Sequence, residues 1–303
     1  MIGANLVRRL IADGCNVSVF TRNGINLSNL SSIQDQFEVL QGNITDLHSV
    51  KTAINAARPD VVFHLACTPF NMPRITAQEH FQVNAEGTLN VLEAVQEFSD
   101  TRVVFTGSVA AYGSGSMLSE NRPLEPSTLL GASKACASLM LQTYARLHET
   151  QTIELRLFAP YGPWEHPRRL IPHVIISALR GLEIPMTLGE QRRDYVHVDD
   201  VVEALVRAGK WSIPSGTVLN IGSGIGTPVR DIAERILDLM GNPVRLLVGE
   251  LPTRPDEIME MSAEITAAQE LLDWQPQISL EDGLKMSIAW FTENRELASI
   301  DSP

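Results

Sequence analysis

The sequence predicts a doubly wound parallel α/β sheet followed by a smaller C-terminal lobe. Through the first half of the chain, short runs rich in β-branched residues alternate with amphipathic helical patterns. After about residue 160 the alternation becomes less regular, beginning with the proline-rich stretch APYGPWEHPRRLIP. Strands that alternate with helices form right-handed crossovers, which make the sheet parallel and cover both of its faces. These two observations predict the fold class.

The elements can be assigned in chain order. The strand candidates are NVSVFT (16–21), FEVL (37–40), VVFHLA (61–66), RVVFTGS (102–108) and IELRLF (153–158). Between them, apolar residues at spacings of three and four mark helices. Two later strands, TVLNIGS and VRLLVG, lie among the helices of the second lobe. We therefore expect a first domain over residues 1–165, which also receives parts of 193–224, and a lobe formed mainly by 166–303.

The chain begins with a helical pattern, MIGANLVRRLIADG, in which Leu6, Val7 and Leu10 form the apolar stripe. A doubly wound nucleotide-binding domain usually begins with a strand and a glycine-rich turn before this helix. Here that strand is absent and Gly3 is the only glycine near the start of the helix. Because the first strand is central in such sheets, we expect either an upstream start codon or another segment in its place.

Composition restricts the function. The formal net charge of -12 argues against a nucleic-acid partner. Three widely spaced cysteines match no zinc spacing and indicate a reducing compartment. No run approaches the roughly 18 apolar residues of a membrane helix, and the N-terminus lacks the apolar region of a signal peptide. We expect a cytoplasmic protein that uses no membrane partner.

Motifs along almost the whole chain carry a family resemblance. In order they are IGANLVRRL, DVVFHLA, NAEGTLNVLEA, FTGSVAAYG, GASK, LRLFAPYGPWEHPRRLIP, RRDYVHVDDVV, LNIGSG, RPDE and LLDWQP. The chain resembles the extended short-chain dehydrogenase/reductases, specifically the NAD-dependent epimerase/dehydratase group that acts on nucleotide sugars. The resemblance implies a Rossmann-type sheet, with the C-terminal lobe binding the substrate.

The resemblance also implies a nicotinamide cofactor. Gly3 matches the last glycine of the family's phosphate-binding turn, and the earlier glycines are missing. At the end of the second family strand, Thr21 replaces the acid that NAD users carry, and Arg22 follows it. A cation without a carboxylate suits a 2′-phosphate, so we expect NADP, with NAD as the alternative. The other cofactor contacts implied by the resemblance are Asn43, Ile44, Leu65, Ala66 and Lys134.

The catalytic positions of the family are only partly filled. Its serine orients the substrate hydroxyl, its tyrosine transfers the proton, and its lysine lowers the tyrosine pKa and holds the nicotinamide ribose. Ser108 and Lys134 match the serine and the lysine, but Leu130 occupies the tyrosine position. Leucine has no titratable proton, so the usual mechanism cannot run through this residue. The hydroxyl groups of Tyr112, Tyr161 and Thr128 are the alternatives to the missing phenol, and the sequence favours none of them.

On the substrate side, Arg193 and Arg254 match arginines that relatives use on the nucleotide diphosphate, and guanidinium groups suit phosphate oxygens. Trp164 and Arg169, together with His166, are expected to form a wall around the sugar. The remaining histidine motifs do not supply three convergent ligands, so we expect no metal site.

Two functional hypotheses remain open. The first is a 4-epimerase, dehydratase or 4-ketoreductase of nucleotide sugars, with impaired or altered catalysis. The second is a non-catalytic member that binds a nucleotide or nucleotide sugar, or serves as a partner subunit. The resemblance further predicts a homodimer through the helices that contain NAEGTLNVLEA and GASKACASLMLQTYARL, whose apolar positions exceed what one sheet face needs.

Overall fold

A parallel sheet lies at the centre of the first domain in this computed structural model, which describes residues 1–25, 27–68, 75–254 and 257–295. Its strand order is β10-β6-β4-β3. The strands are β3 (Val61–His64), β4 (Arg102–Ser108), β6 (Thr152–Leu157) and β10 (Thr217–Ile221). All three pairings are parallel. The predicted fold class is confirmed.

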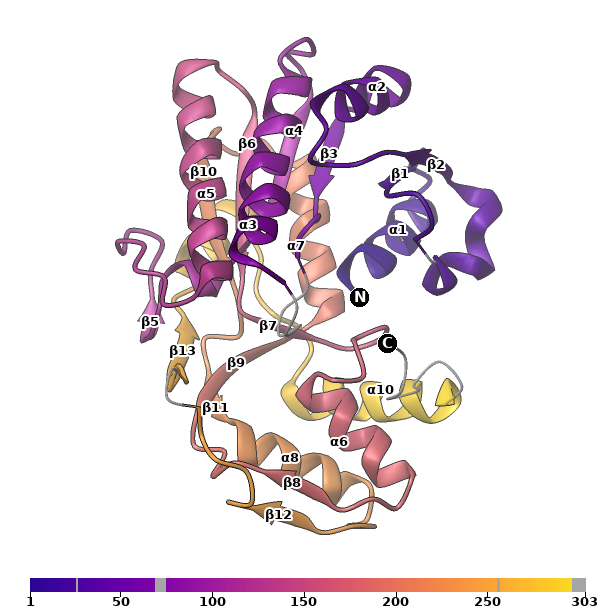
Figure 1. Ribbon diagram of the computed structural model, residues 1–303, viewed down its shortest axis with the longest axis vertical. Helices are drawn as coiled ribbons and strands as arrows, with labels where there is room; N and C mark the ends of the chain where they lie inside the picture. The colour runs from indigo at the N-terminus through magenta and orange to yellow at the C-terminus, as the bar shows by residue number, and fades with distance from the viewer. Residues whose placement is uncertain (26, 69–74, 255–256, 296–303) are drawn as a thin grey trace.

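A second parallel pair stands apart from this sheet. It consists of β1 (Ser18–Thr21) and β2 (Glu38–Gln41), and β1 follows the first helix α1 (Ile2–Ala12). No bridge joins β1 to β3 in the described ranges, so none of the segments described there fills the position of the expected central strand. Figure 1 shows α1 beginning near the middle of the molecule, where N marks the start of the chain.

Helices cover both faces of the four-stranded sheet because successive strand residues point to opposite faces. On one face, Val103 and Phe105 of β4 pack in a cluster with helix residues such as Leu92 and Leu141. On the other face, Val104 packs in a separate cluster that contains Leu6. The helices of the first cluster are α2 (Leu47–Ala57), α4 (Gly87–Val95) and α5 (Leu129–Leu147). Those of the second cluster are α1, α7 (Val198–Lys210) and α9 (Thr266–Leu272).

Shorter helical segments complete the first domain. A short helix α3 (Ala77–His80) and a π-helical turn η2 (Phe81–Glu86) precede α4. The 3₁₀ segments η1 (Ser28–Gln36) and η3 (Val109–Ala111) follow β1 and β4.

The lobe has its own apolar core at the opposite end of the molecule (Figure 1). Its elements are α6 (Leu170–Leu179), β8 (Ile184–Met186), α8 (Val229–Leu239), β12 (Leu246–Val248) and α10 (Leu280–Glu293). Short strands connect it to the first domain: β5 (Gly115–Leu118), β7 (Ala159–Tyr161), β9 (Arg192–His197), β11 (Gly226–Pro228) and β13 (Glu260–Ala263). β9 is the hub of these strands, because it pairs with β7, β11 and β13.

Helices in the part of the chain that the structure describes are all too short or too polar to cross a lipid bilayer.

Candidate functional site

A cleft of about 1290 Å³ opens at the carboxyl ends of β3, β4 and β6, between the first domain and the lobe. We call it the central cleft. Open α/β sheets bind ligands at this edge, because the loops that leave the strands converge there. Its lining includes Gly3, Leu65, Ser108, Leu130, Lys134, Trp164, Glu165, Arg169, Arg193 and Arg254.

Ser108 and Lys134 meet in this cleft from two different elements. Lys134 lies on α5 and is only 4% exposed. Its Nζ donates to the carbonyl of Thr106 at 2.8 Å and lies 4.6 Å from the centre of the Phe105 ring. Ser108 ends β4, and its Oγ accepts a hydrogen bond from the backbone N–H of Ala110 at 3.2 Å. The structure therefore brings the predicted serine and lysine together.

The start of α5 is fixed by local geometry. Thr128 caps the helix, and its Oγ1 accepts from the N–H of Gly131 at 3.0 Å. A Cβ at position 131 would collide with the carbonyl of Ala110, so only glycine permits this close approach of α5 to the segment after Ser108. These contacts fix the position of α5, and therefore of Lys134, along β4.

A buried ion pair packs against the parts of β4 and α5 that carry Ser108 and Lys134. Glu154 and Arg156 are neighbours on one face of β6, both 2% exposed, and their ion pair measures 3.2 Å from Nε to Oε1. Ser138, one turn beyond Lys134 on α5, donates to Glu154 and accepts from Arg156. A Cβ at Gly107 would collide with the Glu154 carboxylate, so glycine precedes Ser108 for steric reasons.

Leu130 lines the central cleft one helical turn before Lys134, as the sequence spacing predicts. Neither tyrosine considered as a substitute lines the cleft in the described structure. Tyr112 donates to Asn220 Oδ1 at 2.8 Å, and burial raises its pKa to about 12. Tyr161 is equally buried, and burial raises its pKa further. Thr128 does line the cleft, but its hydroxyl serves as the α5 cap.

The predicted cofactor residues divide into two groups. Gly3, Leu65 and Lys134 line the central cleft. Five others lie outside the set of described lining residues: Thr21, Arg22, Asn43, Ile44 and Ala66. Asn43 Oδ1 accepts from the N–H of Thr45 at 3.1 Å in a local turn. The Ile44 side chain packs in the apolar cluster that includes α4.

The start of α1 fits a bound dinucleotide phosphate. The first backbone N–H groups of a helix have no intrahelical partner and favour anions. The first turn of α1 contains no acidic residue, and no side chain caps it. Met1, Ile2 and Gly3 line the cleft, and a Cβ at Gly3 would meet nothing within 4 Å, which leaves room for a ligand.

The predicted substrate residues occupy the lobe side of the cleft. Arg193 pairs with Glu257 and donates to the carbonyl of Ile258. Trp164 packs edge-to-face on Trp290 with ring centres 4.9 Å apart. Arg254 is an exposed lining residue of the same side.

Sequence reasoning missed Glu165, which lines the cleft between Trp164 and the helix α6. Its side chain is 6% exposed, and its Oε1 accepts from Arg169 Nε at 3.3 Å. Its other oxygen, Oε2, is buried and has no hydrogen-bond partner. Burial raises the pKa of this carboxyl to about 7. In the sequence, an acid beside arginines in a proline-rich loop looks like an ordinary surface glutamate.

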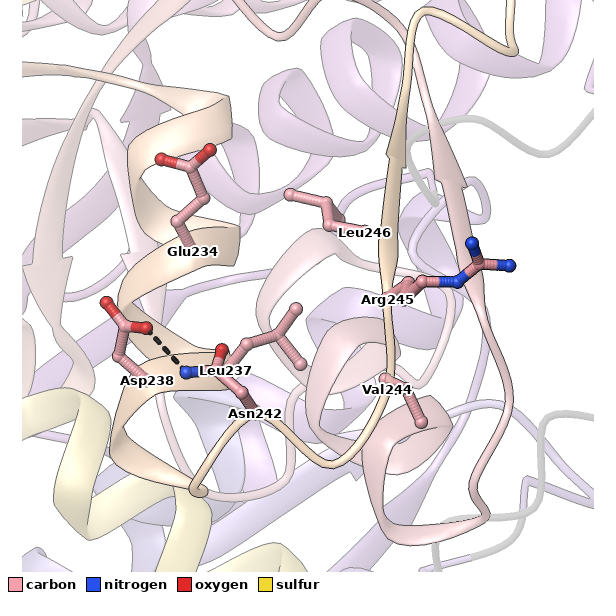
Figure 2. Close-up of a pocket in the computed structure, with 7 residues that line it drawn as sticks. All are labelled: Glu234, Leu237, Asp238, Asn242, Val244, Arg245 and Leu246. Atoms are coloured by element: carbon pink, nitrogen blue, oxygen red, sulfur yellow. Dashed lines mark hydrogen bonds between the residues drawn. The ribbon is translucent and has the colours of Figure 1, made fainter.

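A smaller depression of about 420 Å³ lies on the lobe between α8 and β12. Figure 2 shows Arg245 pointing away from Glu234 and Asp238, and Asp238 bonding to Asn242. Arg245 instead pairs with Glu183, and Asp238 and Asn242 satisfy each other, so these polar groups are already engaged. The central cleft is therefore the candidate site.

A parallel sheet with a helix N-terminus at its ligand-binding edge defines a dinucleotide-binding protein of the Rossmann type. Residues 1–222 match the NAD dependent epimerase/dehydratase family, and the chain belongs to that family of nucleotide-sugar-modifying enzymes. It is 30% identical over 302 residues to the UDP-glucose 4-epimerase of Mycolicibacterium smegmatis, covering 96% of this chain and 95% of that protein. It is 26% identical over 310 residues to the dTDP-D-glucose 4,6-dehydratase of Bos taurus, covering 97% of this chain and 86% of that protein.

Among solved structures, the chain resembles the UDP-glucose 4-epimerase of Thermotoga maritima in its complex with UDP-glucose. The TM-score is 0.90 at 26% identity, and the match covers 97% of this chain and 96% of the other. The predicted family and its nucleotide-sugar chemistry are thus confirmed at the level of the family.

Proposed function

We propose that this protein binds a nucleotide sugar and a nicotinamide dinucleotide in the central cleft. It then interconverts an alcohol and a ketone on the sugar, as a 4-epimerase, a 4-ketoreductase or a dehydratase. The observation that carries the proposal is the convergence of Ser108 and Lys134 with Arg193 and Arg254 on one cleft. The curated relatives include both an epimerase and a dehydratase, so the choice of reaction is left to experiment.

We assign a role to each of these residues. The backbone N–H groups at the start of α1 hold the cofactor pyrophosphate, and Lys134 faces the nicotinamide ribose. Arg193 and Arg254 bind the substrate diphosphate, while Trp164 and Arg169 contact the sugar. Ser108 hydrogen-bonds the reacting hydroxyl. When bound, the cofactor supplies a hydride acceptor and donor.

The cofactor we propose is NADP, with NAD as the alternative. Arg22 follows the end of β1, is exposed, and supplies a cation where an acid would repel a 2′-phosphate. Calorimetric titration with both dinucleotides tests this. Tighter binding of NADP is expected, and Arg22→Ala should abolish the difference, whereas a tenfold preference for NAD would contradict the proposal.

The assembly we propose is a homodimer through α5. Leu139 and Leu147 on this helix are 57% and 71% exposed, which leaves apolar area uncovered on a helix that otherwise packs on the sheet. Light scattering at micromolar concentration should report a dimer, and Leu139→Glu should shift it toward the monomer. A monomer in the unaltered protein would contradict this assignment.

Turnover distinguishes the enzyme from its alternative. The alternative is a non-catalytic nucleotide-sugar binder, and the observation that favours it is Leu130 in the cleft. The test incubates the protein with UDP-glucose, UDP-galactose or dTDP-glucose and each dinucleotide, and separates the products chromatographically. Conversion supports the enzyme. Binding by calorimetry without conversion supports the alternative.

A further inference from the structure

The central cleft lacks the usual proton-transfer group, and this inference rests on the proposed function. Oxidation of a sugar hydroxyl releases a hydride and a proton, and the proton needs an acceptor poised near neutral pH. Leu130 cannot accept it. Tyr112 and Tyr161 do not line the cleft in the described structure. Tyr195 does line it, but burial raises the pKa of its phenol far from neutrality, and the Thr128 hydroxyl is engaged as a helix cap.

Glu165 is a buried acid in the wall of this cleft. It lines the same cleft as Ser108 and Lys134. One carboxylate oxygen is held by Arg169, which fixes the orientation of the group. The other, Oε2, is buried without a hydrogen-bond partner. An unpaired buried carboxylate oxygen is costly in a structure and calls for an explanation, and a ligand hydroxyl would satisfy it.

We propose that Glu165 transfers the proton in place of a tyrosine, through its carboxylate and either directly or through one water molecule. In the oxidative direction the sugar C–H bond breaks, and its hydride goes to the nicotinamide of the oxidised cofactor. The hydroxyl O–H bond breaks, its proton goes to the Glu165 carboxylate, and the C–O bond becomes a carbonyl. In the reductive direction the neutral acid returns the proton to the forming alkoxide as the hydride returns to carbon.

The surroundings of Glu165 place its titration near neutrality. Burial favours the neutral acid and raises the pKa to about 7, while Arg169 opposes this shift. The other titratable groups that face it are the amino group of Met1, just before α1, Tyr161 on β7 and Tyr195 on β9. A pKa near the operating pH is the optimum for a group that both accepts and donates a proton.

Glu165→Gln tests the proposal, because glutamine keeps an oxygen for Arg169 but cannot ionise. The matched control is Glu120→Gln. Glu120 is a half-buried carboxyl whose pKa is also raised by burial, but it accepts from the N–H of Asn220 and lies outside the described cleft lining. The substrates are those of the turnover assay, and the affinities for UDP-glucose and the dinucleotide are measured in parallel by calorimetry.

We expect Glu165→Gln to lower kcat by about 10²–10⁴-fold with both affinities unchanged, and to remove the inflection of kcat near neutral pH. Glu120→Gln should keep both the rate and the inflection. Glu165→Asp, which retains a carboxyl, should keep a pH-dependent residual rate. Difference infrared spectra should show a protonated-carboxyl band that titrates near neutrality in the wild type and is absent from Glu165→Gln.

Each contrary result is distinct. Wild-type kcat and pH profile in Glu165→Gln would overturn this inference and leave the proposed function intact. Equal losses of binding and kcat would show a merely structural role and would also overturn it. A wild type that binds both ligands without conversion would overturn the inference together with the catalytic part of the proposed function.

Discussion

The two walls of the central cleft are built in different ways. The β4–α5 wall presents Ser108 and Lys134 from regular elements, and the buried Glu154–Arg156 pair supports it. The opposite wall, which we call the β7–α6 loop, presents Trp164 to Arg169 from a connection without regular structure before α6. On the first wall, Leu130 occupies the position where the resemblance places a tyrosine. The second contains a buried acid, Glu165, to which we assign the proton transfer.

The largest effect is expected from moving the proton group back to the β4–α5 wall. In the Glu165→Gln background, Leu130→Tyr places a phenol one turn from Lys134, whose charge favours the phenolate and lowers its pKa. The rate on a nucleotide sugar should then rise by about 10²–10⁴-fold, measured at saturating cofactor. Leu129→Tyr, at an exposed neighbouring position, is the control and should give no gain. If neither tyrosine restores turnover, the two walls are not interchangeable.

The support of the β4–α5 wall is expected to make a large contribution to stability. Glu154→Gln leaves the buried Arg156 without its counter-charge, which should lower the free energy of unfolding by about 3–5 kcal/mol in urea denaturation. The combined change Glu154→Leu with Arg156→Met removes both charges and should cost much less. A single variant as stable as the wild type would show that this ion pair does not support α5.

The Glu165 carboxyl in the β7–α6 loop should make the free energy of unfolding depend on pH. The folded-state pKa of Glu165, about 7, is above its ordinary 4.5, so the fold disfavours the carboxylate. Its contribution to stability is therefore complete below about pH 4.5 and is lost as the pH rises through about 7. Glu165→Gln should exceed the wild type in unfolding free energy by on the order of 1–3 kcal/mol near pH 8 and match it near pH 4. A constant difference at all pH values would argue that Glu165 does not titrate there.

The smallest effect is expected on the lobe side of the cleft. Arg193→Lys keeps the charge but loses the planar fork that suits a diphosphate. Affinity for UDP-glucose should fall by about threefold to tenfold, the net worth of one hydrogen bond, with kcat unchanged. Arg245→Lys, whose arginine pairs with Glu183 away from the cleft, should leave the affinity unaltered. A large fall in kcat for Arg193→Lys would place this residue near the reacting atoms instead.

Sequence patterns predicted one wall of the site much better than the other. Ser108 and Lys134 were predictable because they match motif positions of the family that the chain resembles, and both line the cleft. Other predicted cofactor residues, such as Asn43, lie outside the described lining of the cleft, and Asn43 uses its amide oxygen in a local turn. Glu165 escaped prediction because its burial comes from packing between α1, the β7–α6 loop and β9, which are distant in the sequence.

The sequence by itself determined the parallel α/β fold and the family, and it put a leucine, Leu130, where the resemblance places a tyrosine, since each of these depends on periodicity or on residue identity. Only the tertiary structure decided which polar side chains are buried away from water and which of them find a hydrogen-bond partner. Tyr112 and Asn220 satisfy each other in the core, whereas Glu165 Oε2 is buried at the cleft without a partner. The physical reason is that the pKa and hydrogen bonding of a side chain depend on what surrounds it in space, and no local pattern specifies those neighbours.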